Sequence, residues 1–415
     1  MSLDHYVTLG RSGLRVSPFA LGAMTFGADP GGAGVDVAEA EEILTRYLER
    51  GGNFIDTANF YTNGHSEAIL GDYFRARPGQ RDRVVLASKF FTNMYPGDPN
   101  GGGAGRRSIV AQLEQTLRRL QTDHLDLYWL HNWDRNTPVE ETLRALDDLV
   151  RAGKVRYIGF SNTPAWVTAQ AQTTAVLRGW TPLIAVQIEY SLLARTVEHE
   201  MAPLARDQGM ALVPWSPLKN GFLSGKYRRA GAVDDSARAD FVGRPTDEQF
   251  TVIDTVAAVA AEVGATPAAV ALAWLRGRPG TVVPIVGARR LRHLTDNLAG
   301  LEIVLTDAQR AALDAASAPP PIDPRTAERC GACDVAVRGN HRRRGIVYGV
   351  SASAAERCAV LRGLSRAAGV DRGGPRGSSP ERWDPLSAGQ IRYRGPTAAT
   401  GRRHSPVARW SAARR

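Results

Sequence analysis

Residues 51–71 have the sequence GGNFIDTANFYTNGHSEAILG, which places two ionisable residues beside the end of one predicted strand. The apolar run NFID predicts a buried strand that ends at Asp56, and Tyr61 follows shortly after it. Lys89 ends a second apolar run, RVVLASK, and His131 ends a third, LDLYWLH. Polar residues at successive strand ends are typical of a parallel α/β barrel, which carries its active site on the face where the strands end.

Predicted strands and helices alternate along the chain, which indicates a parallel sheet with crossover helices. The chain begins with a predicted hairpin, which we expect to plug the barrel floor. It consists of YVTLG, a turn at residues 11–13, and LRVS. The eight predicted strands are FALGAMTFG, NFID, RVVLASK, LDLYWLH, VRYIGFS, LIAVQIEYS, MALVPWSPL and TVVPIVG. The predicted fold class is therefore α/β, a (β/α)8 TIM barrel with an N-terminal β-hairpin.

Two later segments complete the predicted barrel. Residues 219–250 are long, polar and Gly-rich and follow the seventh strand, so we expect a lid or a cofactor clamp there. Thr266 and Pro267 predict the N-cap and first position of an extra helix. Residues 307–316 predict the last folded helix.

Composition divides the chain at about residue 318. Residues 319–415 contain 19 Arg, no Lys and seven acidic residues, a net charge of +12, while residues 1–318 have 33 basic and 35 acidic residues, or −2. We therefore expect a barrel domain over 1–318 and a disordered, low-complexity, Arg-rich tail over 319–415. An Arg-rich, Lys-free bias is what a GC-rich gene gives in a shifted frame, so we interpret the tail as an altered reading frame.

Several classes of partner are disfavoured. The sequence pI of 9.8 arises from the tail, so it is no evidence for specific nucleic-acid binding. Cys330 and Cys333, with His341 nearby, resemble half a zinc site but lack a second pair, so no metal is predicted. Residues 1–318 have no cysteine, no signal peptide and no apolar run near the roughly 20 residues that span a membrane. We expect a cytoplasmic protein, a monomer or weak oligomer, with no membrane partner.

The four strand-end residues together suit carbonyl reduction. Tyrosine has a pKa of about 10, and a nearby ammonium lowers it while a carboxylate fixes that ammonium. Tyr61, Lys89 and Asp56 fit these roles, and His131 can orient the carbonyl. Taken singly, each has a structural alternative, since Asp56 could cap a helix and Lys89 could be a solvated strand end. His131 could be a satisfied histidine at the barrel mouth.

From Leu9 to about Leu313 the chain resembles the aldo-keto reductase superfamily. The resemblance rests on the motifs quoted above and on GFSN, QIEYSLL, PWSPLKNGFLSGKY and VPIVGARRLRHLTDNL. Within it the chain is similar to the bacterial branch related to the potassium-channel β-subunits. The resemblance implies a catalytic tetrad of Asp56, Tyr61, Lys89 and His131, a small-molecule carbonyl substrate and the cofactor NADP(H). No GxGxxG motif follows a strand, so a Rossmann site is not expected.

The resemblance also implies the cofactor contacts. Those for the nicotinamide end are Ser161, Asn162 and Gln187, which would hold the carboxamide, and Trp215, which would stack on the ring. Those for the pyrophosphate are Ser216, Leu218, Gly221 and Lys226. Those for the adenosine end are Gly287, Arg289 and Asn297, and Arg290 beside Arg289 adds to the case for NADPH. The expected substrate pocket consists of Phe26, Phe60, Phe91, Trp129 and Trp133.

Three hypotheses about function follow. The first is an NADPH-dependent oxidoreductase that reduces aldehydes and ketones to alcohols with Tyr61 as general acid. The second is a redox-sensing, NADP-binding regulatory subunit of the channel β-subunit type with slow turnover, which the intact tetrad disfavours. The third is a poorly folding, inactive protein with an altered C-terminus.

Overall fold

The computed structural model describes residues 2–27, 34–95, 97–229 and 243–320. The predictions made for residues 321–415, including disorder and the half zinc site at Cys330 and Cys333, lie outside the described residues.

Eight parallel strands form the barrel, in the order β10-β3-β4-β5-β6-β7-β8-β9. They are β3 (Ala20–Gly22), β4 (Phe54–Asp56), β5 (Val85–Phe90), β6 (Leu125–Leu130), β7 (Val155–Ser161), β8 (Leu183–Glu189), β9 (Ala211–Trp215) and β10 (Ile285–Gly287). A parallel bridge between Leu212 and Val282 places β9 beside the segment that enters β10, so the sheet curls back on itself. The prediction of a (β/α)8 barrel is confirmed.

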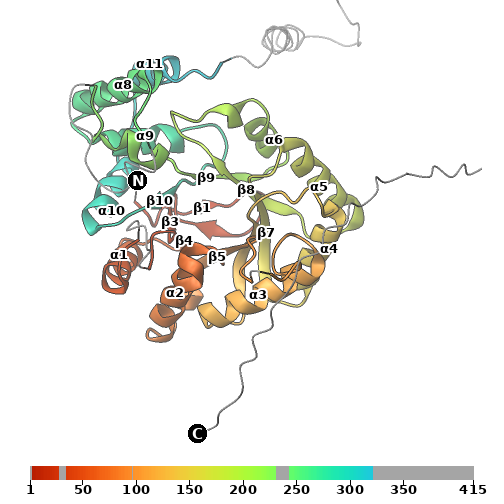
Figure 1. Cartoon of the computed structure of the whole chain (residues 1–415). Coiled ribbons are helices and arrows are strands. Elements are labelled where there is room, and N and C mark those ends of the chain that lie inside the picture. The colour runs from red at the N-terminus through yellow and green to blue at the C-terminus, as the bar shows by residue number, and fades with distance from the viewer. Residues whose placement is uncertain (1, 28–33, 96, 230–242, 321–415) are drawn as a thin grey trace, which may run out of the picture. The chain divides into compact units, whose positions relative to one another are not determined.

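Helices surround the strands (Figure 1). They are α1 (Val37–Glu49), α2 (His65–Arg75), α3 (Arg106–Leu120), α4 (Val139–Arg151), α5 (Ala165–Arg178), α6 (Met201–Asp207), α8 (Asp247–Val263), α9 (Pro267–Arg276), α10 (Leu291–Leu298) and α11 (Asp307–Ala316). Thr266 caps α9 by accepting from the Ala269 backbone N–H, with Pro267 in its first turn, as predicted. The helix α8 was not predicted. It begins where the Thr246 side chain and Gln249 form a capping box.

The N-terminal hairpin closes the floor of the barrel. Its strands β1 (Val7–Thr8) and β2 (Arg15–Val16) pair antiparallel. Leu9 and Val16 are fully buried in an inner apolar cluster that they share with inward-facing strand residues such as Leu127. Gly10 has φ +60°, and a Cβ there would overlap the carbonyl oxygen of Ile184, so only glycine fits this close approach.

Non-glycine residues with positive φ are concentrated at the opposite end of the barrel. Among the described residues, eight non-glycine residues have positive φ, and seven of them lie in loops that follow a barrel strand. The seven are Thr62, Asn63, Phe91, Asn162, Ser216, Lys219 and Asn220. Such conformations cost free energy in non-glycine residues and persist where the surroundings hold them in place. The strand-end face is therefore the strained side of the fold.

Polar contacts fasten the last described helix, α11, to the barrel. Asp314 Oδ1 accepts from Trp274 Nε1 at 3.0 Å and from an Arg278 guanidinium nitrogen at 2.8 Å. Arg195, which is 8% exposed, donates to Ser317 Oγ at 2.9 Å. Buried hydrogen bonds to charged groups contribute more than neutral ones. Helix α11 and Ser317 are thus packed as part of the barrel domain.

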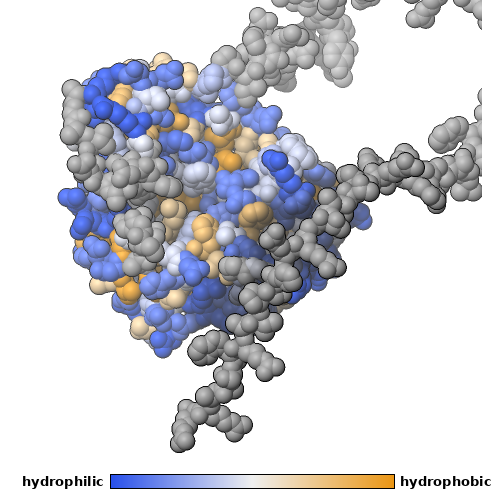
Figure 2. All heavy atoms as spheres, viewed as in Figure 1, coloured by the Kyte–Doolittle hydropathy of each residue, from blue (hydrophilic) through white to orange (hydrophobic). Residues whose placement is uncertain are grey.

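On the face seen in Figure 2, hydrophobic residues lie in small groups between hydrophilic ones. Within the described ranges, no single helix is both long and apolar enough to cross a membrane. The pair α8 and α9 passes that test together on length and composition, with a bend of 96° between the two helices.

Candidate active site

Lys89 is the centre of the candidate site. It lies on β5 with its side chain fully buried, and its ammonium forms an ion pair with Asp56 Oδ2 of the neighbouring strand β4. The same nitrogen lies 2.8 Å from the Thr57 carbonyl oxygen and 3.1 Å from the Tyr61 hydroxyl. The β4–β5 register, which aligns Asp56 with Ala87, brings these groups together. The first three predicted tetrad residues therefore form one hydrogen-bonded chain.

Burial and neighbouring charges have opposite effects on the pKa values of Tyr61 and Lys89. Burial raises the pKa of Tyr61 above 10, and the nearby Lys89 charge offsets this only in part. The sequence analysis expected the Lys89 ammonium to lower the pKa of Tyr61, but burial of the phenol has the larger effect. Burial also opposes the charge on Lys89, but Asp56 and Tyr61 outweigh it and raise the pKa of Lys89. Around neutral pH, Tyr61 is thus a phenol beside an ammonium.

His131 completes the group. It directly follows β6, and its ring centroid lies 6.0 Å from that of Tyr61 and 5.2 Å from that of Phe60. Burial, together with the Lys89 charge, lowers the pKa of His131 to about 3, so the imidazole is neutral. Its Nδ1 atom is buried and has no hydrogen-bond partner among the described residues. The ring is held in place by packing and by its backbone.

The loop that carries Tyr61 is fixed by the chain around it. Residues Tyr61–Gly64 form a short 3-10 element, η1, in which Thr62 and Asn63 have positive φ. Thr62 Oγ1 donates to the Phe26 carbonyl at 2.8 Å and accepts from the Ser66 backbone N–H at 3.0 Å. These contacts tie the Tyr61 loop to β3's following segment and to the start of α2.

A buried ion pair supports the same loop from the outer side. Glu67, in the first turn of α2, is fully buried and pairs with Arg119 of α3 at 2.7 Å. Its other oxygen accepts from Ser88 Oγ, next to Lys89, at 2.5 Å. Sequence analysis missed Glu67 and Arg119, because nothing in either helix pattern indicates that a carboxylate would be buried.

The predicted carboxamide positions lie together at the ends of β7 and β8. Ser161 is 1% exposed, and its Oγ has no partner among the described residues. Gln187 is also buried, and it donates through Nε2 to Asp56 Oδ1 at 3.0 Å. Asn162 Nδ2 donates to the His131 carbonyl at 3.0 Å. The Ser161 hydroxyl leaves a hydrogen-bonding position open beside the Gln187 and Asn162 amides, so these positions fit a carboxamide.

Trp215 ends β9 and is partly exposed, with Nε1 donating to Asn162 Oδ1 at 2.9 Å. Beyond it, Ser216 and Leu218 lead into the short element η4 (Lys219–Ser224). That element contains Gly221 with φ +96°. Lys226 lies just past it, its Nζ 5.1 Å from the Tyr227 ring centroid. The four predicted pyrophosphate contacts therefore lie in one compact loop after β9, and part of the expected lid, residues 230–242, falls outside the described residues.

At the predicted adenosine end, the structure gives two adjacent arginines different surroundings. Arg290, the exposed N-cap of α10, lies 3.5 Å from Glu39 of α1. Arg289 is partly buried and has no carboxylate partner within the described ranges. Asn297 Nδ2 donates to the carbonyl of Gly287 at 3.1 Å, which braces the turn that precedes α10. Arg289 is thus the arginine with its guanidinium uncommitted to a neighbouring carboxylate.

The five predicted pocket residues divide into two groups. Phe26 and Trp129 are 0% exposed, Phe26 in the core between strands and helices and Trp129 inside the barrel. This placement corrects the expectation that they line the pocket mouth. Phe60 is 38% exposed beside His131, and Phe91 and Trp133 are partly exposed.

Trp166 is an exposed aromatic residue that the sequence analysis missed. It lies at the start of α5, is 61% exposed, and contacts Trp133 edge-on with ring centroids 5.5 Å apart. The Ala- and Gln-rich pattern of this helix gave no signal for it.

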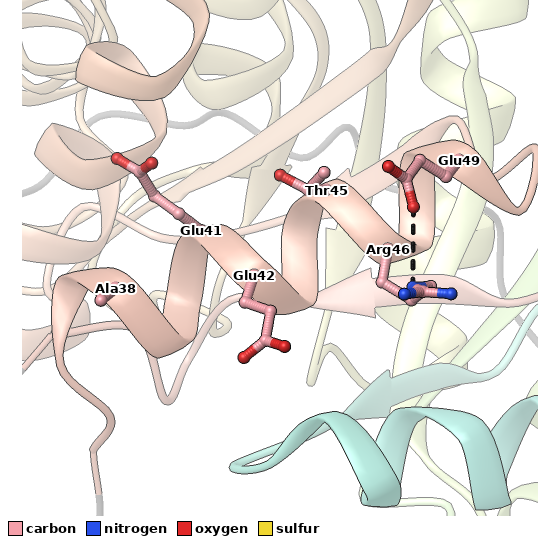
Figure 3. A pocket seen from close by; sticks show the side chains of 6 residues that line it. All are labelled: Ala38, Glu41, Glu42, Thr45, Arg46 and Glu49. Carbon is pink, nitrogen blue, oxygen red and sulfur yellow. Dashed lines mark ion pairs between the residues drawn. The ribbon is translucent and has the colours of Figure 1, made fainter.

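A separate hollow lies on the outer side of α1 (Figure 3). It is lined by Ala38, Glu41, Glu42, Thr45, Arg46 and Glu49. An exposed pair, Arg46 with Glu49 at 3.6 Å, crosses it. None of the candidate site residues lines this hollow, so it is distinct from the strand-end site.

Comparison with known proteins matches this arrangement to one family. The model described as "Aldo/keto reductase family" matches residues 18–318. The chain is 40% identical over 310 residues to the uncharacterized oxidoreductase YrpG of Bacillus subtilis (strain 168), covering 72% of this chain and 92% of YrpG. It is 36% identical over 310 residues to the putative aryl-alcohol dehydrogenase AAD14 of Saccharomyces cerevisiae, covering 72% and 82%.

Norsolorinic acid reductase stcV of Emericella nidulans is 36% identical over 311 residues, covering 73% of this chain and 79% of that protein. The narrower relationship to potassium-channel β-subunits, expected from the sequence, is not established by these comparisons.

Proposed function

Because the chain belongs to the aldo/keto reductase family, we propose that it is an NADPH-dependent oxidoreductase that reduces aldehydes and ketones to alcohols. Tyr61 is the general acid in this proposal. The observation that carries it is the buried Lys89 ammonium, which contacts both the Asp56 carboxylate and the Tyr61 hydroxyl. Proton donors of this kind are typically worth about 10²–10⁴ in rate.

Each tetrad residue has a separate task in this mechanism. The substrate carbonyl oxygen accepts the Tyr61 proton, and the neutral His131 ring beside it donates to or orients that oxygen. As the proton leaves, negative charge develops on the Tyr61 oxygen, 3.1 Å from Lys89 Nζ. The ammonium stabilises that charge in a site shielded from water, where electrostatic stabilisation is strongest. Asp56 holds the ammonium in place and keeps it charged.

NADPH, when bound, supplies the hydride that reaches the carbonyl carbon. The unpartnered Ser161 hydroxyl and the Gln187 amide would hold its carboxamide, and the Trp215 indole would cover the ring. The loop after β9, with Ser216, Leu218, Gly221 and Lys226, would bind the pyrophosphate. Gly287, Arg289 and Asn297 would bind the adenosine end.

The proposed substrate class is an aromatic aldehyde or ketone. Phe60 is exposed directly beside His131, and Phe91 and Trp133 are partly exposed on the loops after β5 and β6. Aromatic side chains favour flat apolar ligands through stacking and edge contacts. Two relatives carry names that refer to an aryl alcohol and to norsolorinic acid.

The barrel domain is proposed to comprise residues 1–318, with 319–415 as a tail.

Loss of NADPH absorbance with a panel of aromatic and aliphatic aldehydes tests the proposal. We expect turnover with aromatic aldehydes and at least a tenfold weaker response with NADH, measured on both the full chain and a chain that ends at Ala318. A protein that binds NADPH but turns over none of the panel would instead support the regulatory-subunit hypothesis.

A further inference from the structure

The first turn of α2 carries a buried carboxylate. Glu67 is 0% exposed, and its two oxygens accept from different elements of the barrel. One oxygen accepts from Ser88 Oγ on β5 at 2.5 Å, and the other accepts from Arg119 Nε on α3 at 2.7 Å. Glu67 therefore ties the start of α2 to a strand through one oxygen and to a neighbouring helix through the other.

Close packing between α2 and α3 fixes the position of Arg119. A Cβ on Gly71 of α2 would lie 2.2 Å from the Arg119 carbonyl oxygen, so the two helix backbones are in contact there. A Cβ on Gly64 would lie 2.9 Å from Arg119 Cδ, so the aliphatic part of this side chain lies against the last residue of η1. Arg119 thus covers the end of the Tyr61 loop while its guanidinium pairs with Glu67.

This network connects the two elements that carry the Tyr61 hydroxyl and the Lys89 ammonium. Ser88 directly precedes Lys89 on β5, and η1, which begins at Tyr61, continues without a break into α2. Residues 62 and 63 of η1 have positive φ, a strained conformation that persists where the surroundings hold it in place. The placement of the first turn of α2 on β5 therefore helps to set the distance of 3.1 Å between the Tyr61 hydroxyl and Lys89 Nζ.

Stability alone gives little reason for an ion pair at this position. Burying a carboxylate and most of a guanidinium costs desolvation free energy, and apolar residues of similar volume often give equal or greater stability. Hydrogen bonds to a carboxylate differ from apolar contacts because they fix a direction. We infer, resting on the proposed function, that Glu67, Arg119 and Ser88 are positioning residues, which hold the Tyr61 hydroxyl at hydrogen-bonding distance from Lys89.

The first test uses the protein without cofactor or substrate. With ¹³C at the ζ carbon of tyrosine, the chain gives signals from 11 tyrosines, and Tyr61→Phe identifies that of Tyr61. Glu67→Gln keeps the shape of the side chain but removes its charge and replaces one acceptor with a donor. We expect this variant to shift the Tyr61 signal, because the phenol moves relative to Lys89. Tyr47, whose hydroxyl donates to the Phe19 carbonyl at 2.8 Å, is the control, and its signal should not move.

The second test compares kcat with NADPH affinity, measured by calorimetry. Because a small misplacement of a catalytic group lowers the rate steeply, Glu67→Gln should lower kcat about 10- to 100-fold and leave NADPH affinity unchanged. Asp147→Asn is the matched control for loss of a buried carboxylate. Asp147 is 2% exposed, pairs with Arg151 at 2.7 Å and accepts from the Thr181 backbone N–H at 2.9 Å, but it lies on α4, which carries none of the tetrad residues. That variant should lose stability and keep its kcat.

Ser88→Ala is a milder variant, because it removes one donor to Glu67 and leaves the ion pair with Arg119 in place. It should shift the Tyr61 signal and lower kcat in the same direction as Glu67→Gln, by a smaller factor. If Glu67→Gln does not fold, Ser88→Ala carries the same measurements. Adding either substitution to Tyr61→Phe should leave kcat at the value of Tyr61→Phe alone, because a residue that acts through the phenol has no further effect once the hydroxyl is gone.

Three results would overturn the inference. They are an unchanged Tyr61 signal in the folded variants, an unchanged kcat in both of them, and a further fall in kcat when either substitution is added to Tyr61→Phe. Because the tyrosine signal is measured without cofactor or substrate, it decides the inference even if the protein turns over no carbonyl compound.

Discussion

Gln187 donates from Nε2 to Oδ1 of Asp56 at 3.0 Å, although the two residues lie on opposite sides of the barrel. Their strands, β8 and β4, are four positions apart in a ring of eight. Both side chains are buried, so the hydrogen bond crosses the barrel mouth and satisfies the carboxylate oxygen that Lys89 leaves free. The proposed cofactor side and the proposed proton-donating side of the site are therefore joined directly.

Gln187→Met should destabilise the protein without cofactor and also impair the reaction. It leaves a buried carboxylate oxygen without its donor, which costs about 1–3 kcal/mol. Urea unfolding and kcat measure the two effects. Gln172→Met is the matched control, because Gln172 is also buried, and among the described residues its side chain bonds only the Leu183 backbone, at 2.9 and 3.2 Å. That variant should lose stability and keep its kcat; equal loss of kcat in both variants would contradict the coupling.

Tyr61→Phe should lower kcat by about 10²–10⁴ while leaving the fold and NADPH binding intact. Tyr128→Phe is its control, since Tyr128 is a fully buried phenol whose hydroxyl has no partner in the described structure. Removing an unsatisfied buried hydroxyl should leave kcat unchanged and stability equal or higher. A Tyr61→Phe protein that kept most of its turnover on an aromatic aldehyde would show that another group donates the proton.

Lys89→Met should be comparably inactive but also less stable than Tyr61→Phe. It leaves the Asp56 carboxylate buried without its cation, and breaking a buried pair costs about 3–5 kcal/mol. Comparing the unfolding free energies of the two variants checks this. If Lys89→Met were as stable as Tyr61→Phe, the ion pair would contribute little to the fold.

His131 should make stability depend on pH below neutrality. The unfolded imidazole has a pKa of about 6.5, whereas burial and Lys89 lower the folded pKa to about 3. As pH falls from about 6.5 toward 3, the unfolded chain therefore binds a proton that the folded chain does not, and stability is lost. The slope is at most one proton, about 1.4 kcal/mol per pH unit. Urea unfolding of His131→Gln at pH 7 and 5 should show a smaller loss than the unmodified protein, and identical losses would place the imidazole in a solvated site.

Arg289→Ala should erode the preference for NADPH over NADH chiefly by weakening NADPH. A charge-assisted hydrogen bond is worth about 1.5–3 kcal/mol, or roughly 10- to 150-fold. Arg290→Ala is the control, because Arg290 is exposed and pairs with Glu39 at 3.5 Å. It should change the preference little. Equal affinity of the unmodified protein for both cofactors would remove the basis for assigning Arg289 to a 2′-phosphate.

Truncation should separate the barrel from the tail. A chain that ends after Pro320 should keep its unfolding free energy, because the contacts of Asp314 and Ser317 lie before that point. Asp314→Ala, in contrast, should cost about 1–3 kcal/mol by leaving buried donors unpaired. Trypsin should remove the Arg-rich segment and leave a core of barrel size. Loss of cooperative unfolding on truncation would place part of the tail inside the fold.

The sequence predicted the strand order and the clustering of Asp56, Tyr61 and Lys89 because both follow from one rule. Parallel barrel strands all end on the same face, so polar residues at successive strand ends must meet. The net effect on the Tyr61 pKa was not predictable, since it depends on how deeply the phenol is buried. That depth is set by the loop geometry after β4, which no local pattern encodes.

The misplacement of Trp129 has a different cause. Side chains alternate along a strand, and Trp129 shares the inward face of β6 with Leu127, so it fills the barrel interior. Because Trp129 lies only two residues before His131 in the sequence, the mouth had been predicted instead. Trp166 and the capping box of α8 were missed because their significance comes from tertiary neighbours and from a helix start inside a polar segment.

The positive-φ residues at the strand ends have a consequence for protein engineering. Each of these residues holds a backbone conformation that glycine adopts more easily. A search for thermostable variants would therefore find that Asn63→Gly or Asn220→Gly relieves backbone strain and raises stability. The same face carries Asn162, whose φ is also positive and whose side chain contacts His131 and Trp215. Selection for heat resistance alone would therefore tend to relax the reactive end of the barrel first, trading activity for stability.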